Sequence, residues 1–310
     1  MDKHNNLEQN IIDFIEYKDV KPITKGSYER ILFEYMKYVN SLPKPPTREN
    51  VKKYRNILGN RLKATSTQKH IVVIRNFYEW LYAEGRGDNI AIGIKGVRIE
   101  NDFKREPLSK KQAHNLLEYA ASISGRSILE LRNFAMISLM ITTGLRTIEV
   151  ERSDKNDIHF IEDAQALFVM GKGRDDKDSY VKLSPQVFDL ISEYLFSRSD
   201  DYDPLFINHG RNQKRARIST RTISKTVKEY FQDVGILGSK YTAHSLRHTA
   251  ATMAMLEGAG LHSTQHMLRH KSPNTTQIYL HKLTRRQEFY EKKISESLFG
   301  DILENREDKK

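Results

Sequence analysis

The side chains best suited to phosphate chemistry gather in residues 244–279. His244 and Arg247 stand three residues apart in a stretch with helical spacing, so both can address one anionic group from the same side. A second predicted helix carries His270, and after the helix-breaking sequence KSPN the chain reaches Tyr279. The guanidinium, the imidazoles and the phenol of this short stretch can therefore converge on a single phosphate.

Taken one at a time, these residues have ordinary structural explanations. A histidine on an amphipathic helix is usually structural, and a tyrosine flanked by aliphatic residues usually belongs to a core. Two further segments change the interpretation, namely TTGLRTIEVE with Arg146 and GKGR with Lys172. The order Arg, Lys, His-x-x-Arg, His, Tyr resembles the catalytic set of the tyrosine recombinases, also called the phage integrase family. The resemblance runs from about Pro107 to Tyr279 and extends more loosely over the N-terminal hundred residues.

The resemblance implies a complete catalytic set: Arg146, Lys172, His244, Arg247, His270 and Tyr279. Guanidinium forks suit the nonbridging oxygens of a phosphodiester, whose negative charge grows in the pentavalent state. In the family, the residue matching His244 accepts the proton of the nucleophile, the lysine protonates the 5′ oxygen, and the second histidine binds the phosphate. Attack by the tyrosine would leave a 3′-phosphotyrosine link, which preserves the bond energy for rejoining.

Two positions around this set have alternatives. Glu149, three residues after Arg146, is placed to hold the guanidinium by a charge-assisted bond, although a weak local helix ion pair is the simpler explanation. Lys172 is the favoured catalytic lysine because it lies at a Gly-Lys-Gly turn. The residues after Arg174 carry three aspartates and lack the arginine usual in the family, so Lys177 is its competitor.

Composition limits the classes of function. The chain of 310 residues has 51 lysines and arginines against 40 acids, a net charge of +11 that favours a polyanionic partner such as DNA. The absence of cysteine excludes disulfides, thiolate catalysis and Cys-ligated zinc. The N-terminus is polar and no apolar run approaches the roughly 20 residues of a membrane span. We therefore expect a soluble cytoplasmic protein, and because GKGRDD is not a nucleotide-binding loop, no cofactor.

Three other functions compete with recombination. A metal site would use the pairs His244 with His248 and His266 with His270, but neither pair has the glutamate of H-E-x-x-H. A type IB-like topoisomerase would share the tyrosine chemistry without exchanging strands between duplexes. A DNA-binding regulator would keep the appearance of the site without turnover.

The apolar pattern predicts a mainly α-helical fold with a small antiparallel β-sheet. Four amphipathic helices in residues 1–86 would form one helical domain, the fourth opening at a Thr65–Gln68 capping box. The resemblance implies that this is a DNA core-binding domain. Residues 87–106 show no helical stripe and are interpreted as a linker. Residues 107–300 would form the α+β catalytic domain, and residues 301–310 a C-terminal tail.

Within the catalytic domain, local signals place the main elements. Ser109 and Gln112 form a capping pair, and a buried helical stripe ends at Gly144, which puts Arg146 at the start of the next helix. Short apolar runs between residues 157 and 183 predict the sheet, and Ser184 with the following proline opens another helix.

Basic side chains are the expected DNA contacts, although a solvated basic surface is the alternative. The candidates are Lys52, Lys53, Arg55, Lys69, Arg75, Arg215, Arg217, Arg221 and Lys225. The resemblance implies double-stranded DNA with an inverted-repeat site as the partner. It also implies a homo-oligomer, a tetramer in the synapse, in which the C-terminal helix docks on a neighbouring protomer.

Overall fold

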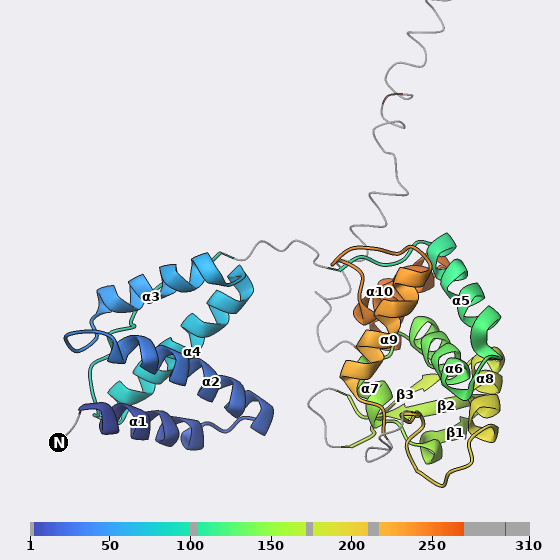
Figure 1. Cartoon of the computed structure of the whole chain (residues 1–310), viewed down its shortest axis with the longest axis horizontal. Coiled ribbons are helices and arrows are strands. Elements are labelled where there is room, and N and C mark those ends of the chain that lie inside the picture. Colours follow the sequence, from blue (N-terminus) through green and yellow to red (C-terminus); the bar gives the residue numbers. More distant parts are fainter. Residues whose placement is uncertain (1–2, 99–104, 172–175, 210–216, 270–294, 296–310) are drawn as a thin grey trace, which may run out of the picture. The chain divides into compact units, whose positions relative to one another are not determined.

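The computed structural model describes residues 3–98, 105–171, 176–209, 217–269 and 295. The chain divides into two compact units, residues 1–102 and 103–310 (Figure 1). The described part is mainly helical and contains one small antiparallel sheet, as the sequence predicts. Among these residues, no helix is both long and apolar enough to cross a bilayer.

The first unit consists of the four predicted helices, α1 Lys3–Tyr17, α2 Pro22–Asn40, α3 Arg48–Arg61 and α4 Ala64–Ala83. Their apolar faces meet in one core, in which Phe14 of α1 and Phe77 of α4 pack edge to face with ring centroids 5.5 Å apart. Aromatic pairs in this geometry stabilise a core beyond the apolar area they bury. The unit therefore has a hydrophobic core of its own.

The entry into α4 and the segment after it differ from prediction. Helix α4 begins at Ala64 without a side-chain cap, so the Thr65–Gln68 capping box is wrong. Instead, Oε1 of Gln68 accepts a hydrogen bond from the backbone N–H of Val97 at 2.8 Å. Ala91 and Ile94 are buried in the core of the first unit, so the first half of the segment interpreted as a linker packs on the helices.

The second unit is built around one apolar helix. Its elements are α5 Lys110–Ser124, α6 Ile128–Thr143, α7 Thr147–Arg152, the short 3-10 helix η1 Lys155–Asp157, β1 Ile158–Ile161, β2 Ala164–Val169, β3 Ser179–Lys182, α8 Pro185–Phe196, α9 Thr220–Asp233, α10 Ala243–Leu256 and α11 Leu261–Met267. Helix α6 is buried over most of its length and packs against α5, α8 and α10. It is therefore the scaffold that the other helices surround (Figure 1).

Local caps set the ends of these helices. Ser109 and Gln112 form the predicted reciprocal capping box at the start of α5, with N···O distances of 2.9 and 3.2 Å. Ser184 caps α8, and Pro185 is its first residue, as predicted. The sheet has the order β1-β2-β3, and Leu167 of the middle strand pairs with Ile158 and Val181.

Gly144 ends α6 in the left-handed conformation, with φ of 66°, as the sequence predicts. A Cβ at this position would lie 2.5 Å from Cδ2 of Leu268 and 3.3 Å from Cβ of Ala250. Helices α6 and α10 and the turn after α11 thus meet at a point that has no room for a side chain.

Replacing Gly144 by alanine is expected to destabilise the second unit by roughly 2–4 kcal/mol, because backbone strain and overpacking add. Gly235 is the matched control, since its φ is 74° and a Cβ there would meet nothing within 4 Å. Gly235→Ala should cost only the backbone strain, about 1–2 kcal/mol. Urea denaturation of both variants measures the difference, and equal losses would contradict the close contact at Gly144.

Candidate active site

Arg146 and Glu149 form a tight pair at the start of α7. Arg146 is the N-cap residue of this helix, and Nη1 of its guanidinium donates to Oε1 of Glu149 at 2.8 Å. Its backbone N–H also donates to Oε2 at 2.8 Å. The side chain of Glu149 has no exposed surface, whereas that of Arg146 is 26% exposed. The buried carboxylate thus holds an arginine that still reaches the surface, which is what a phosphate-binding guanidinium requires.

Arg247 on α10 approaches the same carboxylate. Its Nη1 lies 4.0 Å from Oε2 of Glu149, so two guanidinium groups flank one carboxylate. Its Nη1 also donates to the carbonyl of Gly144 at 2.6 Å, and its Nη2 donates to the carbonyl of Leu268. The side chain is only 1% exposed. Main-chain carbonyls thus bind both ends of the Arg247 fork, and its contact with a phosphate stays a prediction.

His244 lies one helical turn before Arg247 and is exposed. Its pKa is nevertheless lowered to about 4, first by desolvation from the surrounding protein and then by the positive charges of Arg247, Arg146 and Arg105. The ring packs edge to face on His248, with centroids 4.7 Å apart. A histidine with such a pKa is neutral at pH 7 and has a free lone pair with which to accept a proton.

The pKa of His244 is expected to rise when DNA binds, because a phosphate anion offsets the charges of the three guanidinium groups that lower it. NMR titration of the ring protons should give a midpoint near 4 in the free protein and a higher one in a complex of the Tyr279→Phe variant with DNA. A midpoint that stays at the free value on DNA would contradict a place for His244 beside the phosphate.

Arg269 belongs to the same cluster, although the sequence analysis did not single it out. Its Nη2 donates to Oε2 of Glu149 at 3.0 Å, and its side chain is 12% exposed. The pKa of Glu149 reflects this surrounding: burial alone would raise it, but Arg269, Arg146 and Arg247 together hold it below 4.5. Glu149 is therefore ionised and binds three arginines.

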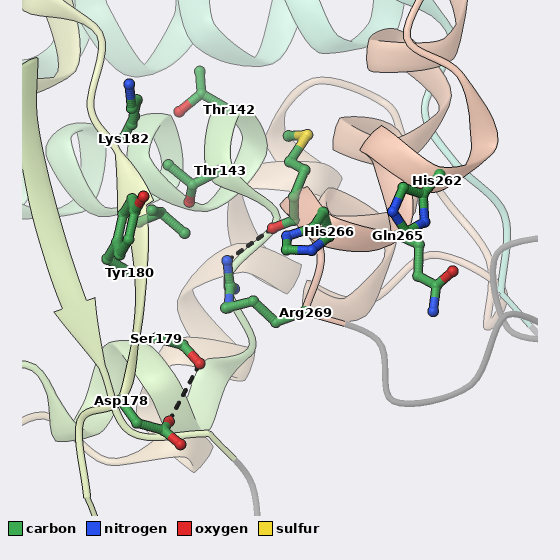
Figure 2. Close-up of a pocket in the computed structure, with 12 residues that line it drawn as sticks. Thr142, Thr143, Asp178, Ser179, Tyr180, Lys182, His262, Gln265, His266 and Arg269 are labelled. Atoms are coloured by element: carbon green, nitrogen blue, oxygen red, sulfur yellow. Dashed lines mark hydrogen bonds between the residues drawn. The ribbon is translucent and has the colours of Figure 1, made fainter.

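A cavity of about 690 Å³ opens beside this cluster. Its lining includes His262, His266 and Arg269 from α11 and the turn after it, and Tyr180 and Lys182 from β3 (Figure 2). The edge strand of the sheet and the last described helix thus face a common space at which Arg269 lies.

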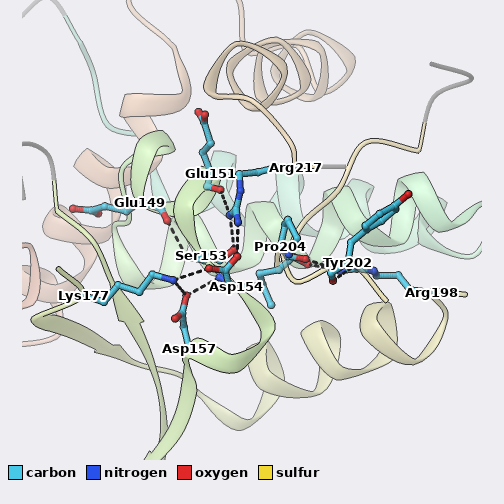
Figure 3. Close-up of polar contacts among 11 residues, drawn as sticks. Glu149, Glu151, Ser153, Asp154, Asp157, Lys177, Arg198, Tyr202, Pro204 and Arg217 are labelled. Atoms are coloured by element: carbon cyan, nitrogen blue, oxygen red, sulfur yellow. Dashed lines mark hydrogen bonds and ion pairs between the residues drawn. The ribbon is translucent and has the colours of Figure 1, made fainter. Parts of the chain in front are cut away.

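Lys177 is fully engaged in another cluster. Its Nζ donates to Asp154 at 2.8 Å and to Asp157 at 2.5 Å, and Arg217 also binds Asp154 (Figure 3). Desolvation would lower the pKa of Lys177, but the bonds to the two aspartates outweigh it and raise the pKa above 10.5. A lysine so paired is a poor proton donor at neutral pH, which favours Lys172 as the acid.

The structure describes some of the other predicted site residues and not the rest. Lys172, His270, Tyr279 and Arg215 lie outside the described residues. Exposed on helices α3, α4 and α9 are Lys53, Lys69, Arg75, Arg221 and Lys225, whereas Lys52 and Arg55 on α3 are partly exposed. Nη1 of Arg55 donates to the carbonyl of Lys95 at 3.1 Å.

The guanidinium of Arg217 is hydrogen-bonded to carbonyl and carboxylate oxygens of the protein. Its Nη1 donates to the carbonyls of Glu151 at 2.8 Å and Ser153 at 3.2 Å, and its Nη2 binds Asp154. These bonds tie Arg217 to the end of α7 and to Asp154, so its guanidinium has a structural function, and its contact with DNA stays a prediction.

Comparison with known proteins agrees with this arrangement. A model of the phage integrase family matches residues 106–286. The tyrosine recombinase XerD of Lacticaseibacillus casei is 31% identical over 300 residues, which cover 87% of this chain and 93% of that protein. In fold, the chain resembles the site-specific recombinase XerH in its pre-cleavage complex with difH (TM-score 0.75, 19% identity, 93% of this chain and 97% of that chain).

It also resembles a lambda integrase tetramer bound to a Holliday junction (TM-score 0.68, 17% identity, 89% of this chain and 76% of that chain). The two structural likenesses concern the fold of both units. The family model spans more than half of the chain, and the similarity to XerD extends over nearly the whole of both proteins. The chain therefore belongs to the phage integrase family, that is, to the tyrosine recombinases.

Proposed function

We propose that this protein is a site-specific DNA recombinase that cuts and rejoins DNA strands through a 3′-phosphotyrosine intermediate on Tyr279. The observation that carries the proposal is the convergence of Arg146 and Arg247 on the buried carboxylate of Glu149, with His244 close enough to both guanidinium groups for their charges to lower its pKa. In the tyrosine recombinases, the residues that match Arg146, His244 and Arg247 surround the phosphate that is cleaved. No observation favours a topoisomerase or a regulator without turnover.

Cleavage would proceed as one displacement at phosphorus. The phenol oxygen of Tyr279 forms the new P–O bond while the bond to the 5′ oxygen breaks, and Lys172 gives that oxygen its proton. A phenol with a pKa near 10 is ionised in only about one molecule in a thousand at pH 7, a deficit of roughly 4 kcal/mol. Neutral His244 would accept the phenol proton, and each such proton transfer is typically worth about 10²–10⁴ in rate.

The positive groups would stabilise the charge that develops on the phosphate. Arg146 is partly exposed and fixed by Glu149, so it can bind a nonbridging oxygen without rearrangement. Arg247 would exchange a main-chain carbonyl for the second oxygen. His270 would complete the set of hydrogen bonds. Rejoining is the reverse reaction with another 5′ hydroxyl, so no external energy source is needed.

DNA with an inverted-repeat site is the proposed substrate. Exposed basic residues on α3, α4 and α9 would bind its phosphates, and this binding should weaken steeply with salt. By analogy with the lambda integrase assembly on a Holliday junction, we propose a tetramer as the synaptic form. In that tetramer the segment after Tyr279 would dock on a neighbouring protomer. The cytoplasm, where chromosomal and mobile DNA are accessible, is the proposed location.

The decisive experiment is covalent capture of DNA. DNA bound covalently to the protein in cells is recovered and sequenced to define the site, and a duplex nicked beside the cleavage position then traps the adduct in vitro. We expect one adduct, with the nucleotide attached to the peptide that contains Tyr279. Specific DNA binding without any adduct would mean that the chain is a regulator. A nucleotide on another residue would contradict the assignment of the nucleophile.

A further inference from the structure

The backbone at Arg269 adopts a conformation that is uncommon for any residue other than glycine. It follows Leu268, the C-cap residue of α11, and its φ is 54°, in the left-handed region that is unfavourable for a non-glycine residue. A glycine would adopt this backbone more easily. A largely buried arginine side chain, 12% exposed, at such a backbone position indicates that the contacts of the guanidinium offset this backbone strain.

The guanidinium of Arg269 joins two parts of the unit that are far apart in the sequence. Nη1 donates to the carbonyl of Met267 at 2.8 Å, and Nη2 donates to Oε2 of Glu149 at 3.0 Å, across 120 positions. The first bond fixes the side chain over its own turn, and the second binds the carboxylate on α7. Its Nε is buried without a partner among the described groups, so the fork ends alone hold this charge in place.

The two oxygens of Glu149 therefore have separate partners. Oε1 accepts from the guanidinium of Arg146, and Oε2 accepts from the backbone of Arg146 and from Arg269. A carboxylate bound on both oxygens cannot rotate about its last torsion. Loss of Arg269 would leave Oε2 with the backbone N–H of Arg146 as its remaining hydrogen bond, so the carboxylate, and with it the fork of Arg146, would be held less firmly.

The bond between Arg269 and Glu149 also helps to position Arg247, through the backbone of the turn after α11. Leu268, whose carbonyl accepts from Nη2 of Arg247, immediately precedes Arg269. The bond between Arg269 and Glu149 ties this turn to α7, so the two forks are held relative to one another. Three guanidinium groups and one carboxylate also give these four side chains an excess of two positive charges, which favours an anion in front of them.

We propose that Arg269 is a positioning residue of the cleavage site, which locks Glu149 and thereby aims Arg146 at the scissile phosphate. This inference rests on the proposed strand-cleavage function. Arg269 itself does not touch the reacting atoms. Its contribution is the fixed geometry of the phosphate-binding forks, and a small misplacement of such groups can cost about 10²-fold in rate.

The test compares Arg269→Gly with wild type on two substrates in the covalent capture assay. Glycine removes the guanidinium and relaxes the backbone, so we expect a folded variant that binds DNA normally and cleaves the phosphodiester about 10–100-fold more slowly. The second substrate carries a neutral methylphosphonate at the scissile position. A neutral group depends less on guanidinium forks, so the deficit of the variant should shrink on it at least several-fold.

Two further variants keep the test decisive. Arg269→Lys retains the charge without the planar fork and should fall between wild type and Arg269→Gly. If Arg269→Gly does not fold, Arg269→Lys takes its place in the test. Arg198→Ala is the matched control, because Arg198 is a buried arginine bound to Asp200 in another part of the unit. Any deficit it shows should be equal on the two substrates.

The outcomes separate this inference from the function it rests on. If wild type forms no adduct, the cleavage function is wrong. If wild type forms the adduct and Arg269→Gly cleaves within about three-fold of it, Arg269 has no positioning function. An equal deficit on the charged and neutral substrates would mean that Arg269 acts only on the stability of the fold, and would also overturn the inference.

Discussion

Replacing Tyr279 by phenylalanine should abolish covalent capture of DNA and leave DNA binding unchanged. The phenyl ring keeps the shape of the side chain but has no oxygen to attack phosphorus. Removal of a nucleophile lowers the rate by at least about 10⁴-fold. We expect no adduct with the nicked substrate after incubation that converts all of the wild-type protein, while gel-shift titrations give the same affinity for both proteins.

Tyr180→Phe is the matched control for this prediction. Tyr180 lies on β3, is 44% exposed and lines the cavity at which Arg269 lies, so it is a hydroxyl near the cluster that could be mistaken for the nucleophile. The Tyr180→Phe variant should form the adduct at nearly the wild-type rate. Adduct formation by Tyr279→Phe together with its loss in Tyr180→Phe would move the nucleophile to the strand.

Replacing Glu149 by alanine should have the largest effect on stability. The substitution leaves Arg146, Arg247 and Arg269 near one another without the carboxylate that all three approach. Breaking a buried ion pair by removing one partner costs about 3–5 kcal/mol. At about 2–4 °C per kcal/mol, the melting temperature should fall by roughly 6–20 °C. Differential scanning calorimetry measures this loss, and cleavage should fall as well because Arg146 loses its aim.

The stability difference should also depend on pH. The pKa of Glu149 is held below its ordinary value of 4.5, so its contribution to stability is present above pH 4.5 and is lost as the pH falls through the folded-state value. Wild type and Glu149→Ala should therefore converge in acid. Glu257→Ala is the control, since Glu257 is exposed and pairs with Lys110 at 3.6 Å. A comparable loss in that variant would contradict the special position of Glu149.

The parts of the site that the sequence predicted are local ones. The apolar stripe of α6, its end at Gly144 and the position of Arg146 at the next helix all depend on residues within a few turns. The pair of Arg146 and Glu149 follows from the three-residue spacing on α7. The same holds for the Ser109–Gln112 capping box, whose two members are neighbours in the chain.

The parts that were missed depend on contacts between distant segments. Gln68 has the right spacing for a capping box, but its oxygen binds Val97, 29 positions away. Lys177 is an equally plausible lysine by sequence until two aspartates 20 and 23 positions earlier are seen to bind it. Arg269 carries no pattern of its own, because its partner Glu149 is 120 positions away. Periodicity and capping rules contain no information on such pairs.

The fork of Arg247 is closed by the carbonyls of Gly144 and Leu268. If Arg247 binds the scissile phosphate as proposed, the phosphate must displace these two carbonyls, and a brief or distant encounter would leave Arg247 unused. The mechanism would then contain a threshold between binding DNA and cutting it. Only a duplex bound closely enough to replace those hydrogen bonds would complete the site, so a freely diffusing protomer would not nick DNA at random.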